Sequence, residues 1–233
     1  MLGWDLAQLG TRISIAGPAW DFSAIVAAAA QAAQRMLDVD TGGGEWLAAL
    51  PARAARTVAT ESWPPNLRVA RERLGALGIE VLAADPVPDN VDQRGGEPAL
   101  PVDDSAFELV VARHAAYVPR EIARVLVPRG TFLTQQVGGD YGDFYEALGL
   151  PRPHIARRWT LELATAQLQD AGLSVVDGAQ GVETTTFADS EALGWYLLAV
   201  PWTVEAPTPN LEGVRMPLRV RLPAFWLRAT RPR

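Results

Sequence analysis

The sequence has no cysteine, which excludes disulfides, a thiol nucleophile and any zinc site built on cysteine. It has only two histidines, His114 and His154, so a histidine-rich metal cluster is excluded too, and we expect no bound metal. Lysine is also missing, and all 21 basic residues are arginine. The composition without cysteine fits a cytoplasmic protein, which is the location we expect.

Long apolar runs are absent as well. The longest stretch of small apolar residues, AIVAAAAQAA from Ala24, is interrupted by Gln31 and follows no basic segment. It is much shorter than the roughly 20 residues that a membrane span needs, and it lacks the features of a secretion signal. We therefore expect a helix of a folded domain and no membrane partner.

Positive charge is scarce, because the net charge is −6 at pH 7. Proteins that bind nucleic acid normally concentrate basic residues on one face. Here arginines gather only near the C-terminus, where Arg219 and Arg221 alternate as on the solvent face of an edge strand. The sequence therefore predicts no nucleic-acid partner.

Short apolar runs alternate with helical spacings along the 233 residues. This alternation predicts one α/β domain with a doubly wound, mostly parallel sheet of seven strands, which binds its ligand at the carboxyl ends of the strands. The expected strands are Met36–Val39, Arg56–Glu61, Ile79–Asp85, Phe107–Arg113, Thr131–Val137, Leu173–Gly178 and Arg221–Ala229. The expected helices are Phe22–Gln34, Glu45–Leu50, Pro64–Gly78, one from Pro119 to just before Pro128, and Thr160–Ala171.

A glycine turn follows the first expected strand, in the stretch RMLDVDTGGGEWL from Arg35 to Leu47. Such a turn lets a ligand lie against bare backbone and the amide donors of the next helix. A dinucleotide fingerprint would need a third glycine where Leu47 stands. Carboxylates at Asp38 and Asp40 suit a ligand with positive charge, and S-adenosylmethionine (SAM) carries both an ammonium and a sulfonium.

The chain resembles the class I SAM-dependent methyltransferases in several ordered motifs. DVDTGGG from Asp38 is similar to their acid-x-G-x-G-x-G motif, with Asp40 in place of the first glycine. Glu61 lies at the end of the second expected strand, where the family has an acid. LPVDDSAFELVVARH and EIARVLVPRGTFLTQQVGG also resemble family segments, the latter with Arg129 in place of a glycine. TQQVGG and WYLLAVPW are similar to a bacterial subgroup of these enzymes.

The resemblance implies a Rossmann-like methyltransferase fold with a small cap, and SAM as the cofactor. In this layout residues 1–34 form an N-terminal helical cap, 35–137 the SAM-binding core, 138–200 a cap or substrate region with a core helix, and 201–233 the C-terminal strands. The residues that it assigns to the cofactor are Asp38, Asp40, Thr41, Gly42, Gly43, Gly44, Glu61, Ser62, Asp85 and Arg113.

Several of these assignments have alternatives. Glu61 is expected to accept hydrogen bonds from both ribose hydroxyls, although it could also be a helix cap or a solvated acid. Asp85 is the candidate for the adenine amino group, with Glu97 as its competitor. Asp38 could orient SAM, tie down the turn, or do both. For Asp40 three readings are open: an altered loop, an extra carboxylate for the SAM ammonium, or damaged SAM binding.

The expected catalytic residues are His114, as a general base one position after the fourth strand, and Tyr117. For a lone histidine at a strand end, a structural hydrogen bond is the alternative. Expected substrate residues come from three segments, and because neighbours on a strand face opposite sides, only one of the two glutamines can reach the pocket. Core packing is the alternative for the aromatic residues from 195 to 202. Trp20 could close over the cofactor, and its alternative is a hydrophobic staple onto the first helix. The six residues are Trp20, Gln135, Gln136, Trp195, Tyr196 and Trp202.

These features predict a SAM-dependent methyltransferase that acts on a small-molecule acceptor by in-line displacement at the methyl carbon. Such chemistry depends chiefly on orientation and on removal of a proton from the acceptor. One alternative is a SAM-binding protein with a non-catalytic or regulatory role, which the substitution by Asp40 suggests. A methyltransferase of RNA or protein is the third hypothesis, and the acidic balance argues against RNA.

Overall fold

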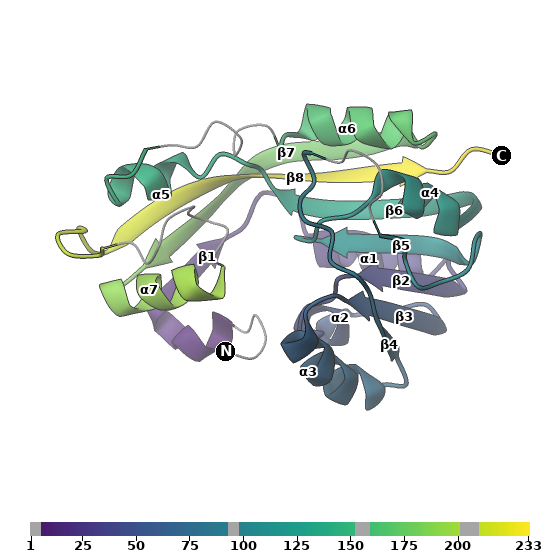
Figure 1. Cartoon of the computed structure of the whole chain (residues 1–233), viewed down its shortest axis with the longest axis horizontal. Coiled ribbons are helices and arrows are strands. Elements are labelled where there is room, and N and C mark those ends of the chain that lie inside the picture. Colours follow the sequence, from purple (N-terminus) through teal and green to yellow (C-terminus); the bar gives the residue numbers. More distant parts are fainter. Residues whose placement is uncertain (1–5, 93–97, 152–158, 201–209) are drawn as a thin grey trace.

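The computed structural model describes residues 6–92, 98–151, 159–200 and 210–233. The described chain forms one mixed sheet of eight strands in the order β1-β7-β8-β6-β5-β2-β3-β4, with helices packed along it (Figure 1). The strands are β1 (Ile13–Ala16), β2 (Arg35–Val39), β3 (Arg56–Glu61), β4 (Glu80–Ala83), β5 (Phe107–Arg113), β6 (Leu126–Val137), β7 (Ser174–Phe187) and β8 (Leu218–Thr230). The helices are η1 (Leu6–Arg12, a 3-10 helix), α1 (Phe22–Ala30), α2 (Glu45–Ala49), α3 (Pro64–Gly75), α4 (Pro119–Val125), α5 (Gly142–Ala147), α6 (Leu161–Asp170) and α7 (Ser190–Ala199).

Five neighbouring strands, from β4 across to β6, pair in parallel, whereas β8, β7 and β1 pair antiparallel. The expectation of a doubly wound, mostly parallel sheet is confirmed. The sequence predicted seven strands, and β1 is the additional one. Its four residues ISIA are mostly exposed, so they show none of the alternation that marks a half-buried strand. The segment 1–34, which we expected to be a helical cap, thus contains a strand besides η1 and α1.

Helices cover both faces of the parallel part of the sheet. Side chains of α1, α2 and α3 join Met36 of β2 in one buried cluster. Side chains of α4 and α6 join Leu37, the next residue of β2, in another. Because successive side chains of a strand point to opposite faces, the continuous apolar run in β2 supplies both cores.

A third apolar cluster lies beside the far ends of β7 and β8, where η1, α5 and α7 gather (Figure 1). Phe144 of α5 stacks on Tyr196 of α7, with ring centroids 5.8 Å apart, and Phe187 packs edge-on against Tyr196 at 5.1 Å. Arg12 donates to both carboxylate oxygens of Asp189 at 2.9 and 2.7 Å, next to the start of α7. We call this part of the molecule, formed by η1, α5, α7 and the ends of β7 and β8, the side lobe.

The last strands are longer than the sequence suggested. β6 starts at Leu126, directly after α4, although the stretch Pro128 to Gly130 predicted a turn. Arg129 adopts φ 66°, and its backbone N–H donates to the carbonyl of Arg231 at 2.8 Å. The strand therefore continues through the expected turn with one left-handed residue. β7 extends to Phe187, because it pairs along nearly its whole length with β8.

Candidate active site

The site lies where the strand order reverses, beside the carboxyl ends of β2 and β5. From β2 the chain winds to β3 and β4 on one side, while β5 and β6 lie on the other. In open α/β sheets the crevice at this switch point binds ligands. The strand ends bring Asp38, Glu61, Arg113 and Gln135 to one edge of the sheet.

The glycine turn between β2 and α2 is tight and buried. Gly42 and Gly44 have φ of 66° and 79°, a region that side chains disfavour. A Cβ on Gly44 would lie 2.7 Å from Cγ of Leu74 in α3, so no larger residue fits. The N–H of Thr41 donates to the carbonyl of Thr60 at 2.8 Å and holds the turn against β3. A ligand can therefore approach the backbone closely here.

Asp40 stands where the family motif has a glycine, and its backbone is left-handed, with φ 54°. Aspartate tolerates this region better than most residues. Its Oδ1 accepts hydrogen bonds from the backbone N–H of Ser62 at 3.0 Å and from the Ser62 hydroxyl at 2.8 Å. Among the three readings of Asp40, these contacts favour an altered loop, because one carboxylate oxygen ties the turn to the residue after β3.

Two buried acids flank the turn. Asp38 and Glu61 are each 2% exposed. Burial raises the pKa of Asp38 to about 7, against the opposing effect of the Arg113 cation. Burial, with the nearby charge of Asp40, raises the pKa of Glu61 to about 8. Oε1 of Glu61 accepts from the N–H of Trp63 at 2.7 Å, whereas its buried Oε2 has no partner among the described residues. A buried oxygen without a partner is costly and fits a hydroxyl donor from a ligand.

Asp85 lies beside a narrow slot after β4. The slot is lined mostly by apolar side chains, including Val39, Leu100 and Val118. Such a lining is compatible with the flat face of a base, so the adenine role of Asp85 stays a prediction. Glu97, the competing candidate, lies outside the described residues. Tyr117 also borders the slot.

Tyr117 does not fit the catalytic role that the sequence suggested. It is 1% exposed and packs edge-on against Phe132 and Trp159, with ring centroids 5.0 and 6.2 Å away. Burial raises the pKa of its hydroxyl well above the usual range. The side chain is thus part of the core beneath the site.

Arg113 ends β5 and is compensated on several sides. Its guanidinium carbon lies 5.5 Å from the ring centre of Trp46, in cation–π contact. Burial lowers the pKa of Arg113, and the charges of Glu183 and Asp38 oppose this. Sequence reasoning missed Trp46 and Glu183. The position of Trp46 directly after the glycine turn was a usable signal, whereas Glu183 of β7 has no local signal because only the sheet brings it here.

His114, Gln135 and Trp20 form one line of hydrogen bonds. Nε1 of Trp20 donates to Oε1 of Gln135 at 2.9 Å, and Nε2 of Gln135 lies 3.1 Å from Nε2 of His114. Gln136 points away from them and bonds the carbonyl of Ala115 at 3.0 Å. Of the two glutamines, Gln135 is therefore the one beside His114, as strand alternation required.

The environment of His114 does not suit a general base with an ordinary pKa. The protein around the ring, together with the Arg113 charge, lowers its pKa to about 3. More than a third of the residue is exposed to solvent, however, which weakens that desolvation. Desolvation and the Arg113 charge both lower the pKa of His114. A histidine that acts as a general base would need a pKa near 6 to 7, and this environment does not provide it.

The other aromatic candidates are in the side lobe or outside the described chain. Tyr196 is 9% exposed within the third cluster, and Trp195 packs against the same cluster. Both side chains pack in the apolar core of the side lobe, which is the alternative to substrate binding. Trp202 lies outside the described residues.

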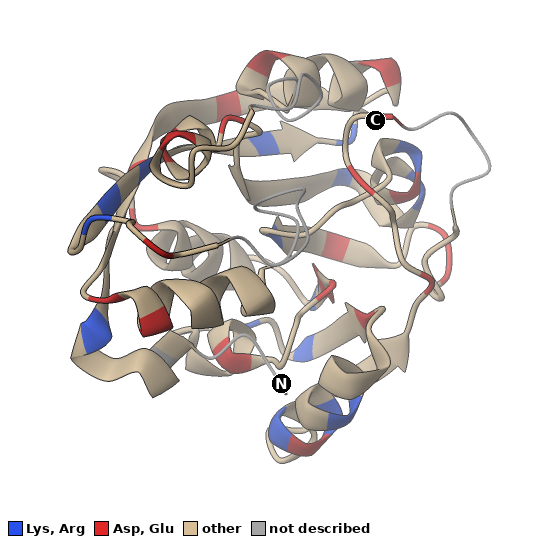
Figure 2. Ribbon diagram, turned by 60° about the vertical axis from the view of Figure 1, so that its left-hand side comes forward, with Lys and Arg blue, Asp and Glu red and all other residues tan. Residues whose placement is uncertain are grey.

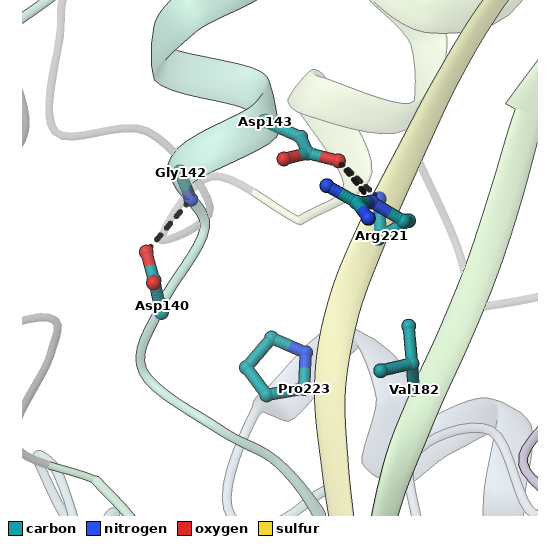
Figure 3. A pocket seen from close by; sticks show the side chains of 6 residues that line it. All are labelled: Asp140, Gly142, Asp143, Val182, Arg221 and Pro223. Carbon is teal, nitrogen blue, oxygen red and sulfur yellow. Dashed lines mark hydrogen bonds and ion pairs between the residues drawn. The ribbon is translucent and has the colours of Figure 1, made fainter.

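A separate surface pocket lies between α5 and the ends of β7 and β8 (Figure 3). Oδ2 of Asp143 accepts from the backbone N–H of Arg221 at 2.9 Å and lies 3.3 Å from its Nε. Val182 lines this pocket, whereas its neighbour Glu183 interacts with Arg113. Because neighbouring side chains on β7 face opposite sides, the pocket lies across the sheet from Glu183 and Arg113.

The described residues also give information on charge, membrane-spanning helices and metal-binding clusters. Arginines and acids are interspersed over the ribbon (Figure 2). No helix of the described chain combines the length and apolar character of a membrane span. The described residues also contain no cluster of three histidines or acids suited to a metal.

Comparison with known proteins supplies the family. Residues 37–134 match the sequence model of a methyltransferase domain. This match identifies a methyltransferase domain in that part of the chain. SAM is accordingly the cofactor of this enzyme. The matched residues run from β2 into β6 and so include the glycine turn, both buried acids and His114. No curated protein is significantly similar to the chain in sequence.

Solved structures agree on the fold. A protein from Bacillus halodurans, provisionally assigned as a methyltransferase, has a TM-score of 0.63 at 21% identity and covers 91% of this chain and 99% of its own. The YcgJ protein of Bacillus subtilis has a TM-score of 0.62 at 16% identity, over 91% and 98%. The [4+2]-cyclase SpnF has a TM-score of 0.55 at 18% identity, over 90% and 79%.

The residues present fit the cofactor. The buried Oε2 of Glu61 has no partner among the described residues, as a ribose-binding acid would in the absence of its ligand. The glycine turn beside Asp38 has no side chains between its backbone and a ligand at Gly42, Gly43 and Gly44, and the slot at Asp85 has an apolar lining. Asp38, Glu61 and Asp85 thus lie on or just after three neighbouring strands, β2, β3 and β4.

Proposed function

We propose that the enzyme transfers the methyl group of SAM to a small-molecule acceptor. The observation that carries this proposal is the convergence of three distant segments on the acceptor side. Trp20 precedes α1, Gln135 lies on β6, and Gly181 of β7 leaves the space in which the Trp20 ring sits. An enclosing wall of this kind suits a small acceptor better than a protruding segment of RNA or protein.

Each residue then has a definite task. When bound, SAM supplies an electrophilic methyl group on its sulfonium. Asp38 and the glycine turn hold the methionine end, and Glu61 accepts from the ribose hydroxyls. Arg113 and its aromatic neighbour Trp46 form the floor between cofactor and acceptor. Because His114 is a poor base, the catalysis rests mainly on orientation, and the acceptor reaches the site with its proton already weakly held.

A non-catalytic role in SAM binding is the second candidate. It is favoured by the lack of a titrating base at His114 and Tyr117. Methylation of RNA is less consistent with the interspersed charges in Figure 2 and the net charge of −6.

One experiment separates these functions. The full chain is titrated with SAM and with S-adenosylhomocysteine by calorimetry, and then incubated with labelled SAM and cell extract that has been divided into small-molecule, protein and RNA fractions. Label in the small-molecule fraction is the expected result. Label in the protein or RNA fraction would assign a different acceptor, and tight binding without any transfer would support the non-catalytic role.

A further inference from the structure

The line Trp20–Gln135–His114 defines the direction of every hydrogen bond in it. The indole N–H of Trp20 can only donate, so the atom of Gln135 that faces it is the carbonyl oxygen, at 2.9 Å. The amide nitrogen of Gln135 is then the atom that faces Nε2 of His114, at 3.1 Å. An amide nitrogen also only donates, so Nε2 of the ring must accept.

An accepting Nε2 has two consequences for His114. The ring is neutral, and its proton is on Nδ1. A proton added at Nε2 would place two N–H groups against each other, so the contact resists protonation independently of burial. Arg113 is the charged group among the described residues that acts on this ring, and it opposes protonation too.

The backbone fixes the position of the ring as well. The N–H of His114 donates to the carbonyl of Gln135 at 2.8 Å, so the two residues are joined twice. His114 has φ 55°, a conformation that is costly for a residue other than glycine. Gln135 is 8% exposed, whereas His114 is exposed. Nδ1 has no hydrogen-bond partner within the described part of the chain, so its N–H is available to a ligand.

We infer that His114 is locked as the Nδ1–H tautomer and donates a hydrogen bond to an electron-rich oxygen, such as a carbonyl or carboxylate, of the methyl acceptor. This inference rests on the proposed function, and it replaces the general base predicted from the sequence. Trp20 and Gln135 are positioning residues, because they act through His114. The expected acceptor therefore carries such an oxygen close to the atom that is methylated.

The tautomer can be measured without any acceptor. Long-range ¹H–¹⁵N correlation spectra of the labelled full chain contain signals from two histidines, which a His154→Gln variant assigns. We expect His114 to show the neutral Nδ1–H pattern from pH 8 down to about 5.5, below the ordinary histidine pKa of about 6.5. An Nε2–H pattern, or protonation near pH 6.5, would overturn the inference.

Three variants test the cause of the lock. Trp20→Phe keeps the ring but removes the donor, so Gln135 can turn over and both tautomers should appear. Gln135→Glu places an acceptor against Nε2, so this nitrogen should take up a proton and the pKa of His114 should rise above its wild-type value. Trp46→Phe is the matched control, because its indole N–H bonds Ser23 instead, at 3.0 Å. An unchanged tautomer in all three would contradict the lock.

Activity separates a donor from a base. His114→Asn retains an N–H near the position of Nδ1, whereas His114→Gly removes the side chain, and both residues tolerate φ 55°. With the fraction labelled in the extract assay, we expect Asn to keep turnover within about fivefold and Gly to lose about a hundredfold. Equal losses in both variants would exclude the donor role. If no fraction is labelled, the proposed function fails, while the spectra still decide the tautomer.

Discussion

At the scale of single residues, two side chains occupy positions where the family motifs have glycine, and both keep a left-handed backbone. Asp40 has φ 54° and Arg129 has φ 66°. The cost of this conformation for an ordinary residue is about 1 kcal/mol. Asp40 offsets it with two hydrogen bonds to Ser62, whereas Arg129 is exposed and makes its contact to Arg231 through the backbone.

We therefore expect opposite results when glycine is restored at these two positions. Arg129→Gly should raise the free energy of unfolding by up to about 1 kcal/mol, because strain is removed and the backbone contact stays. Asp40→Gly should lower it by about 1 kcal/mol, because the contacts to Ser62 are lost. Chemical denaturation measures both. A gain for Asp40→Gly would mean that the Ser62 contacts do not stabilise the turn.

Glu61 is a buried acid whose proposed role in SAM binding is expected to cost stability. Its folded pKa of about 8 lies above the ordinary value of 4.5, so the folded state favours the protonated acid. The stability that protonation provides is complete below about pH 4.5 and is lost as the pH rises to about 8. Glu61→Gln removes a buried charge without changing the shape of the side chain.

The Glu61→Gln variant should thus be more stable than the wild type at pH 8, by about 2 kcal/mol, with the gap closing toward pH 5. Its affinity for SAM should fall by about 1 to 3 kcal/mol, because the ribose hydroxyls lose a charged acceptor. Thermal unfolding across this pH range and calorimetry measure the two effects. A folded variant with unchanged affinity would remove Glu61 from the cofactor site.

At the scale of elements, the strand, turn and helix around the cofactor act as one unit. The turn from Asp40 to Gly44 is held by β3 on one side and touches Leu74 of α3 on the other. A side chain at Gly44 of this turn would therefore be more costly than one at a glycine with free space around it. Gly75, the last residue of α3, has nothing within 4 Å of its would-be Cβ and has a negative φ.

These two glycines form a matched pair for substitution by alanine. Gly44→Ala should destabilise the protein by about 2 kcal/mol or more and weaken SAM binding, since φ is 79° and the methyl group meets Leu74. Gly75→Ala should stabilise it by up to about 1 kcal/mol, because alanine favours the helix. Unfolding curves measure the change in the free energy of unfolding for both variants. Similar effects at the two positions would show that the turn is not tightly packed.

The sequence predicted the elements whose signals are local. The apolar run before Asp38, the three glycines and Pro64-Pro65 each mark a strand, turn or helix start by chemistry within a few residues. β1 was missed because its pairing with β7 is set by the sheet and not by its own pattern. The start of β6 at Leu126 was missed because a left-handed Arg129 carries the strand through Pro128 and Gly130.

At the scale of the whole molecule, the candidate cofactor residues lie in consecutive segments of the chain, whereas the proposed acceptor side is assembled from distant segments. Asp38 and Glu61 were readable because each ends a strand within a known motif. Glu183, on β7, reaches Arg113 only through the sheet order. Trp20 was a candidate from its place before α1, but its bond to Gln135 depends on the space above Gly181.

That dependence gives a prediction for the assembled site. A Cβ on Gly181 would lie 3.0 Å from Cζ3 of Trp20, so Gly181→Ala should displace the indole and break its bond to Gln135. Because the substitution leaves Asp38, Glu61 and the glycine turn unchanged, SAM affinity should change less than about twofold. Methyl transfer in the extract assay should fall by about tenfold or more. A variant with normal transfer would show that the Trp20 position is not needed.

We propose that the buried acids Asp38 and Glu61 form the SAM site, and calorimetry can decide this through the protons that binding releases. The free enzyme holds both with pKa values raised to about 7 and 8, and a cation and two hydroxyl donors favour their charged forms. SAM binding at pH 7, measured in phosphate and in Tris, should therefore release protons, and affinity should rise from pH 6 to 8. Binding without proton release, equal at every pH, or no binding at all would contradict the claim.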